Sequence, residues 1–247
     1  MKKLISVLTS LVLCTGFCLG QGASTYLFET IYLTPKQDHI KQLEANIAAH
    51  NKKFHAEGAH ASVVATVVTG SNSGDYVWAM GPCTYADLDS RPSGSDHQDD
   101  WSTMVLPYVE KMSQAEYWER DENVYYTPTD YAGDKLRIRF HRSGPGTNDQ
   151  IRDLFAQLVA VYKAKQYDRS FTLYWNPFPT AKGRTFATVN GFEKWAMFDK
   201  ESTTAKDFNE LHGADSFAKW LDELNSVIEW TDNEIRQFLP ELAGADN

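Results

Sequence analysis

The segment YVWAMG at residues 76–81 has a counterpart, FATVNG, at residues 186–191, 110 positions later in the chain. Each segment is followed by the same pattern of an aromatic residue, alanine, a large apolar residue and aspartate, at residues 85–89 and 195–199. Further residues, among them two prolines and two tryptophans, recur at offsets of 110 to 112. A nearly constant offset across several segments predicts an internal duplication. The alternative is two unrelated sets of elements with similar composition.

Apolar periodicity predicts the same elements in each half of the chain. In the first half we expect strands at residues 26–33, 61–69, 76–80 and 123–127, and helices at residues 40–54 and 101–112. In the second half we expect strands at residues 135–142, 170–175, 184–190 and 234–238, and helices at residues 151–162 and 217–228. Both halves therefore have the order β-α-β-β-α-β, which is that of a ferredoxin-like unit.

A unit of this order covers one face of its sheet with helices and leaves the other face without a partner. Two such units in one chain, with the pattern at residues 85–89 and 195–199, resemble the dimeric α+β barrel superfamily, including its antibiotic-biosynthesis-monooxygenase-like and NIPSNAP-like domains. We therefore predict an α+β fold of two tandem ferredoxin-like repeats packed as an intramolecular pseudodimer of the dimeric α+β barrel type. The resemblance implies a ligand-binding lumen between two sheets, in a superfamily of cofactor-independent monooxygenases, isomerases, haem enzymes and proteins without a known reaction.

The N-terminus has the pattern of a secretory signal peptide at residues 1–20, with two lysines, an apolar run and then small residues. The apolar run is too short to span a bilayer. We expect export to the periplasm or the medium, after which no membrane span remains. A lipoprotein acylated at Cys14 or Cys18 is the less favoured alternative, because large residues precede both cysteines.

The remaining chain is divided by the same reasoning into a first repeat at 21–128, a linker at 129–134, a second repeat at 135–240 and a tail at 241–247. Loss of the signal peptide would leave Cys83 as the one cysteine, so no internal disulfide is expected.

Composition and charge exclude some functions. The 247 residues are 42% hydrophobic and carry 24 Lys and Arg against 33 Asp and Glu, a net charge of −9. Removal of two lysines with the signal peptide would make the net charge −11. An acidic chain without a basic run is not expected to bind nucleic acid. The expected partner is a small molecule, and the chain is expected to be a monomer or a homodimer.

One strand concentrates positive charge. Residues 135–141 alternate strictly, which places two sets of side chains on opposite faces: Lys135, Arg137, Arg139 and His141 on one, and Leu136, Ile138 and Phe140 on the other. If the apolar face packs against helices, the cationic face points into the lumen. Arg137 and Arg139 are then candidates to bind a carboxylate, enolate or phosphate, and His141 to exchange a proton. Alternatively, these cations pair with acidic residues of neighbouring strands or face water.

An aromatic cluster ends another predicted strand. Tyr174, Trp175 and Asn176 resemble the Trp and Asn side chains that position substrate in cofactor-independent monooxygenases, although the surrounding motif differs. The alternative for these residues is a hydrophobic plug at the mouth of the barrel.

The seven histidines show no H-x-x-x-H or H-E-x-x-H spacing, so we predict neither a metal site nor a cofactor. His50 falls on the apolar face of the helix at residues 40–54 and is expected to be a hydrogen-bonded core histidine. A haem would need an axial ligand, for which His141 or His212 is the candidate.

Three functions follow from these observations. The first is an exported barrel that binds a small anionic or aromatic molecule in its lumen, held by Arg137, Arg139 and His141. The second is a cofactor-independent monooxygenase or isomerase in which His141 is the general base and residues 174–176 position the substrate. The third is an exported structural or interaction protein with a filled lumen. The sequence leaves open whether the protein is an enzyme.

Overall fold

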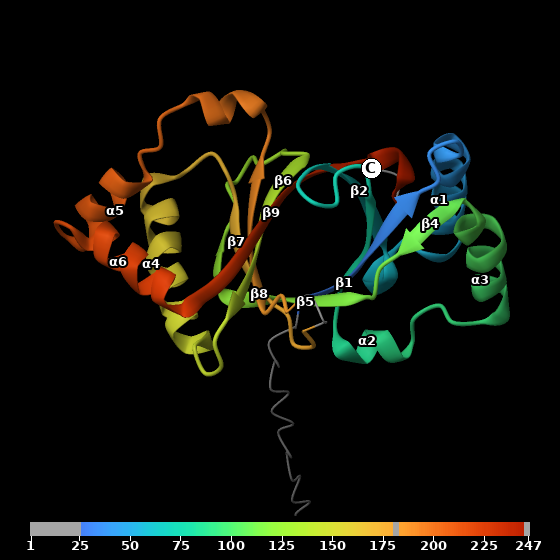
Figure 1. The fold of residues 1–247 in the computed structure, drawn as a ribbon, viewed down its shortest axis with the longest axis horizontal. Coiled ribbons are helices and arrows are strands. Elements are labelled where there is room, and N and C mark those ends of the chain that lie inside the picture. Colours follow the sequence, from blue (N-terminus) through green and yellow to red (C-terminus); the bar gives the residue numbers. More distant parts are fainter. Residues whose placement is uncertain (1–25, 180–182, 245–247) are drawn as a thin grey trace, which may run out of the picture.

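Eight antiparallel strands close into a single barrel with helices outside it (Figure 1). The computed structural model describes residues 26–179 and 183–244, and the predicted signal peptide lies outside these residues. The strands, in chain order, are β1 Leu27–Pro35, β2 Ser62–Thr69, β3 Tyr76–Cys83, β4 Val109–Met112, β5 Glu116–Tyr126, β6 Lys135–Ser143, β7 Phe171–Trp175, β8 Phe186–Phe192 and β9 Ile228–Phe238. The helices are α1 Ile40–Phe54, α2 Tyr85–Asp89, α3 Ser95–Asp100, α4 Asn148–Lys165, α5 Thr204–His212 and α6 Ser216–Val227.

The barrel closes because the two halves of the chain hydrogen-bond to each other at both edges. Its strand order is β3-β2-β9-β6-β8-β7-β5-β1, and β1 pairs with β3 to complete the ring. Two ladders join the halves: β2 pairs with β9, and β5 pairs with β7. The predicted pair of ferredoxin-like repeats packed as a pseudodimer is therefore wrong, although the α+β class agrees. Closure into one barrel removes the unpaired edges that two separate sheets would expose.

Two groups of helices cover opposite sides of the barrel (Figure 1). On one side α4, α5 and α6 pack around a core that includes Phe155, Phe186 and Trp220. On the other side α1 and its neighbours pack around a core that includes Ile47 and Trp78. The outer face of the barrel is therefore buried under helices on two sides.

The helix predicted at residues 101–112 is wrong. The chain instead forms a single π-turn at Trp101–Val105, a 3₁₀ turn at Leu106–Tyr108 and then the strand β4, which pairs with β1. Pro107 lies in the 3₁₀ turn and has no backbone N–H to donate to a helical ladder. The apolar residues of this segment have helical spacing, but they lie in a π-turn, a 3₁₀ turn and a strand.

Two strands begin earlier than their sequences suggest. β5 begins at Glu116 and β9 at Ile228, where we expected strands from residues 123 and 234. Charged residues that are buried within these strands interrupt the alternation of apolar and polar residues, so the alternation does not indicate the full length of either strand. In the interior Glu116 accepts a hydrogen bond from Arg184 at 3.1 Å, and Glu234 pairs with Arg236 at 2.5 Å.

The lumen of the barrel is small and mostly apolar. Its cavity of about 270 Å³ is lined from all eight barrel strands and includes Trp118, Phe140 and Tyr174. One end holds a buried network in which the Tyr32 hydroxyl donates to Glu234 at 2.8 Å and accepts from Arg184 and Arg236 at 3.2 and 2.7 Å. The guanidinium carbon of Arg184 also lies 3.8 Å from the ring centroid of Phe140. Glutamates thus balance the charges of Arg184 and Arg236, so the lumen is not a strongly cationic site for an anion.

The network makes Glu234 important for stability. We expect Glu234→Gln to destabilise the fold by about 3–5 kcal/mol, because it leaves Arg236 buried without its carboxylate. Urea unfolding followed by far-UV circular dichroism measures this loss. Glu210→Gln, which breaks a surface pair with Lys165, is the control and is expected to cost about 0–1 kcal/mol. Equal losses in the two variants would contradict the assignment.

Candidate functional site

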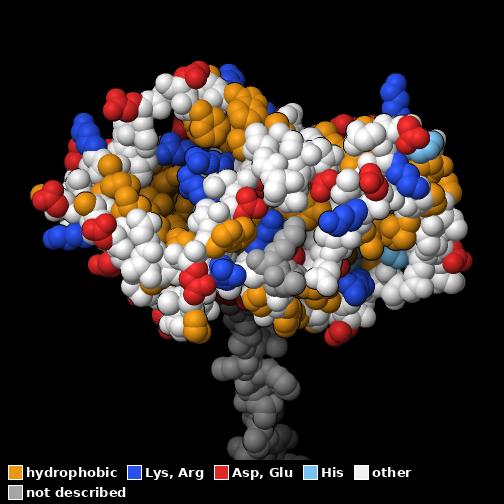
Figure 2. All heavy atoms as spheres, viewed as in Figure 1, with side chains coloured by type: hydrophobic (Ala, Val, Ile, Leu, Met, Phe, Trp, Pro, Cys, Tyr) orange, Lys and Arg blue, Asp and Glu red, His pale blue; other side chains and the backbone are white. Residues whose placement is uncertain are grey.

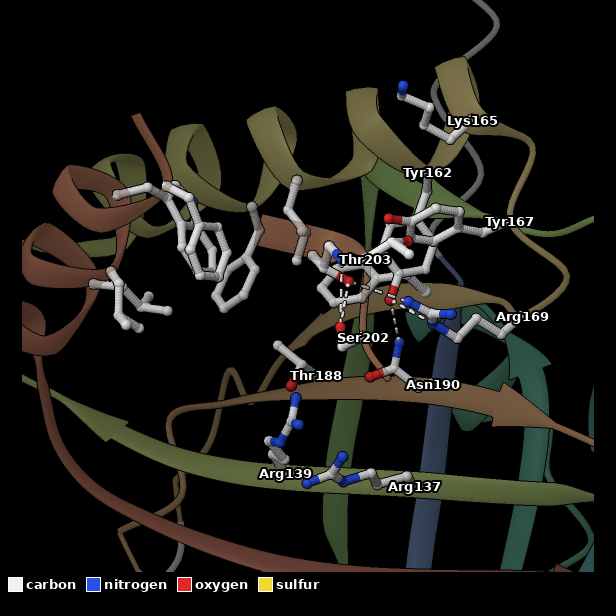
Figure 3. Close-up of a pocket in the computed structure, with 18 of the residues that line it drawn as sticks. Arg137, Arg139, Tyr162, Lys165, Tyr167, Arg169, Thr188, Asn190, Ser202 and Thr203 are labelled. Carbon is white, nitrogen blue, oxygen red and sulfur yellow. Dashed lines mark hydrogen bonds between the residues drawn. The ribbon is translucent and has the colours of Figure 1, made fainter. Parts of the chain in front are cut away.

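A pocket of about 880 Å³ lies between the barrel wall and the helices of the second half (Figure 3). Its floor is the outer face of β6 and β8, with two residues from β9, and its opposite wall is formed by α4 and α6. The loop that leads into α5 closes one side. The volume is within the range of sites that enclose small organic molecules, about 300–1,000 Å³.

The strand β6 supplies the positive charge of the floor. Arg137 and Arg139 both face the helices and line this pocket, whereas Leu136, Ile138 and Phe140 line the lumen. The alternation predicted from the sequence is present, but the cationic face points away from the lumen. The expectation that these arginines face the lumen is therefore wrong, because apolar side chains fill the barrel interior.

Arg137 and Arg139 have no anionic partner among the residues that the structure describes. Neither guanidinium forms a hydrogen bond or ion pair with a described residue, and the group of Arg137 lies 5.8 Å from the ring centroid of Phe198. Burial lowers the pKa of Arg139, and the nearby charge of Arg137 lowers it further. Two neighbouring guanidinium groups without a carboxylate have the charge and the donors that are chemically suited to an anion.

Polar side chains from three elements extend the floor beyond the arginines (Figure 3). The Tyr162 hydroxyl, on α4, accepts hydrogen bonds from Asn190 at 3.1 Å and from Arg169 at 3.3 Å. Arg169 also donates to the Thr204 hydroxyl at 3.2 Å. These bonds fix the side chains that border the arginines.

The helical wall of the pocket is apolar. Phe155 and Leu158 project from α4, and Phe217, Trp220 and Leu224 project from α6. The indole N–H of Trp220 is already used, since it donates to the Leu154 carbonyl at 2.7 Å. The pocket thus presents an aromatic and aliphatic surface opposite a cationic one, and Figure 2 shows Lys, Arg and hydrophobic side chains gathered around a hollow in this half.

Acidic side chains are fewer than basic ones around this pocket. Asp168 and Glu201 line it, against five basic side chains: Arg137, Arg139, Lys165, Arg169 and Lys200. The Lys165 ammonium is paired with Glu210 and Asp207 outside the cationic floor. The excess charge is therefore concentrated on β6, against the negative charge of the whole chain.

His141 lines the same pocket but is a poor general base. Its Nδ1 is 2.9 Å from the Thr231 hydroxyl, its Nε2 is 3.5 Å from the Thr188 hydroxyl, and its ring stacks on Phe186. Burial, with a further contribution from the charge of Arg139, lowers the pKa of His141 to about 3. A group with this pKa is neutral at pH 7 and abstracts protons weakly.

We expect the His141 ring to show no titration between pH 5 and pH 8 when imidazole resonances are followed by NMR. Because the pKa in the unfolded chain is higher, unfolding takes up a proton at acid pH, and this group lowers stability as the pH falls below about 6.5. His141→Gln is expected to reduce that acid sensitivity. A titration midpoint near 6.5 for His141 would contradict the burial argument.

Tyr174, Trp175 and Asn176 are not brought to this pocket. Tyr174 lines the lumen, where its ring contacts Phe28 edge-on. The Trp175 indole N–H donates to Asp121 at 2.9 Å, and the Asn176 side chain accepts from the backbone N–H of Phe178 at 3.0 Å. Successive residues of a strand point to opposite faces, so these three side chains cannot converge on one ligand.

The residues of the pocket do not fit a haem bound through an axial histidine. Both nitrogens of His141 are within reach of threonine hydroxyls. The Nε2 atom of His212, on α5, lies 3.0 Å from the Gln157 carbonyl, and its ring packs on Phe208. Neither candidate ligand has a free nitrogen directed into the pocket, and we derive no haem chemistry here.

Several pocket residues were missed from the sequence. Tyr162 belongs to the apolar stripe of a predicted helix, and Asn190 belongs to the repeated segment, so neither stands out in the sequence as a pocket residue. Arg169 stands alone in a turn before β7 and belongs to no pattern. The alternation of β8, with Thr188 and Asn190 on the same face, was the one signal that could have connected them to β6.

Comparisons with known proteins identify the fold. No protein-family model matches the chain, and no curated protein is similar to it in sequence. Among solved structures, an anthrone oxidase-like protein matches with a TM-score of 0.58 and 11% identity, over 88% of this chain and 92% of the other. A proposed monooxygenase from Lactobacillus acidophilus NCFM matches with a TM-score of 0.53 and 9% identity, over 90% and 97%.

A chlorite dismutase from Candidatus Nitrospira defluvii also matches, with a TM-score of 0.56 and 6% identity, over 89% of this chain and 93% of the other. These structures share the barrel fold of this chain, so the predicted resemblance to monooxygenase-like barrels is confirmed at the level of the fold. It does not extend to the NIPSNAP-like assignment or to the tandem repeat. At these identities the likeness shows the fold alone.

Proposed function

We propose that the protein binds a small molecule with an apolar, aromatic body and at least one anionic group, in the pocket between β6, β8 and the helices α4 and α6. The observation that carries this proposal is the pair Arg137 and Arg139, which have no anionic partner among the described residues and lie opposite an aromatic wall. A carboxylate, sulfonate, phenolate or enolate would lie on the arginines, and the body of the ligand would lie against Trp220 and Phe217.

The electrostatics of the pocket favour this class of ligand. The like charges of Arg137 and Arg139 repel each other in a partly buried site, where the effective dielectric constant is lower than in water. An anion removes this repulsion and makes charge-assisted hydrogen bonds, each worth roughly 1.5–3 kcal/mol. A neutral molecule of the same shape gains only the burial of its apolar surface.

The proposal is tested with 8-anilinonaphthalene-1-sulfonate, an anionic aromatic probe, and its uncharged analogue N-phenyl-1-naphthylamine. Fluorescence titration is expected to show tighter binding of the sulfonate. Arg139→Gln should weaken sulfonate binding roughly 10- to 100-fold, because it removes one charge-assisted contact. The uncharged analogue should be affected little.

Arg142→Gln is the matched control, because Arg142 is three positions further along the same strand, is exposed and pairs with Glu229. It should leave the affinity for the sulfonate unchanged. Equal weakening by Arg139→Gln and Arg142→Gln would show that the probe responds to net charge alone, and the proposed site would be wrong.

A second candidate is oxygenation of an aromatic substrate without a cofactor. It is supported at the level of the superfamily by the anthrone oxidase-like protein and the proposed monooxygenase among the solved structures. In this pocket the arginines would stabilise the anion of an acidic aromatic substrate, which is the form that reacts with oxygen. His141 would lie in the floor as a neutral hydrogen-bonding group and not as the base.

Oxygen consumption with anthrone as the substrate separates the two candidates. Turnover by the purified protein that is lost in Arg139→Gln would support the oxygenase. Binding of the sulfonate probe without oxygen consumption would leave the protein as a binding barrel.

The cellular location of the protein is proposed from its sequence. The signal-peptide pattern at residues 1–20 supports export, and no helix among the described residues is both long and apolar enough to cross a membrane. Sequencing the N-terminus of the protein from the periplasm or the medium tests this proposal. A chain that keeps residues 1–20 and stays in the cytoplasm would contradict it.

A further inference from the structure

Three histidines meet on the side of the barrel opposite the arginine pocket. His50 lies near the end of α1, His55 directly follows that helix, and His97 lies in α3. One ring nitrogen from each histidine lies within 4.8 Å of the other two. We call His50, His55 and His97 the three-histidine cluster. Figure 1 shows α1 and α3 together on this side of the barrel.

The outer partners of two of these histidines determine which nitrogen faces the cluster. His50 Nδ1 lies 2.8 Å from a carboxylate oxygen of Asp100, and His55 Nδ1 lies 2.9 Å from the His60 carbonyl oxygen. Both partners are acceptors, so each Nδ1 carries the proton and donates it. In the neutral imidazoles the lone pair is then on Nε2, which is the atom left to face the cluster.

Among the residues that the structure describes, His50 is the member of the cluster whose Nε2 atom lacks a hydrogen-bond partner. His50 is 1% exposed, and its Nε2 atom is buried without a hydrogen-bond partner. His55 Nε2 lies 3.1 Å from His97 Nε2. A buried nitrogen atom without a hydrogen-bond partner is rare in native proteins and requires an explanation.

We infer that the three-histidine cluster binds a divalent transition-metal ion, with zinc as the ion that the donor set fits. A tetrahedral zinc ion with Zn–N bonds of about 2.0–2.1 Å holds its ligand nitrogens about 3.3 Å apart, close to the separation of His55 and His97. The ion would satisfy the orphaned Nε2 atom of His50. Imidazole is a preferred ligand of zinc and of its neighbours in the first transition series.

The surroundings of the cluster are those of a built metal site. Asp100, through His50, forms the carboxylate–histidine arrangement that orients metal ligands and raises their basicity. The rings of Phe54, Trp78 and Trp101 pack around the histidines. His97 is partly exposed, so water and metal ions can reach the cluster from the side of this residue.

The inference is tested by zinc titration of the purified protein after chelator dialysis and removal of any affinity tag. Isothermal titration calorimetry should show one zinc ion per chain, and Co²⁺ should give the visible absorption of a tetrahedral site. His97→Ala, at the partly exposed position, should weaken zinc binding by on the order of 100-fold or more. Asp100→Asn should weaken it roughly 10- to 100-fold while the Co²⁺ spectrum is retained, because Asp100 acts through His50.

His39→Ala is the control, because His39 is exposed and lies outside the cluster. It should bind zinc as tightly as the unaltered chain, and far-UV circular dichroism should show that every variant is folded. Zinc binding that is absent from the unaltered chain would overturn the inference. Equal weakening by His97→Ala and His39→Ala would also overturn it.

Discussion

The hydrogen-bonded ladders between β2 and β9 and between β5 and β7 are the constraint on which the rest of the structure depends. Once these ladders close the ring, each barrel strand has an inner and an outer face, and a polar side chain on a strand must either be paired inside or lie under the helices. Glu116, Glu234 and Arg236 are paired inside. Arg137 and Arg139 lie outside, where a pocket admits water or a ligand. Closure therefore separates the paired charges of the interior from the two arginines on the outer face.

The sequence allowed the faces of β6 to be predicted but not their direction. Alternation over residues 135–141 depends only on the two-residue period of a strand, and the structure confirms it. Whether the apolar row faces helices or a lumen depends on which partner closes the sheet, and that is a property of contacts between residues far apart in the chain. The same limitation applies to Tyr174, which was grouped with Trp175 and Asn176 although the strand divides them.

Spacing rules failed where the fold brings distant residues together. His50 and His55 are five positions apart and His97 follows 42 positions later, so no local motif connects them. The expectation that His50 is a fully hydrogen-bonded core histidine was half right, since its Nδ1 is bonded and its Nε2 is not. Helical spacing at residues 101–112 was misleading because Pro107 stops the ladder. Packing between residues far apart in the chain thus decides the histidine cluster, whereas the effect of Pro107 is local.

The strand β6 is shared by two compartments. Ile138 and Phe140 pack in the lumen, and Arg137, Arg139 and His141 border the ligand pocket, so any displacement of this backbone changes both at once. The packing density of the barrel interior and the spacing of the two guanidinium groups are therefore mechanically coupled. Sequence changes inside the barrel can therefore alter the spacing of the two guanidinium groups from a distance.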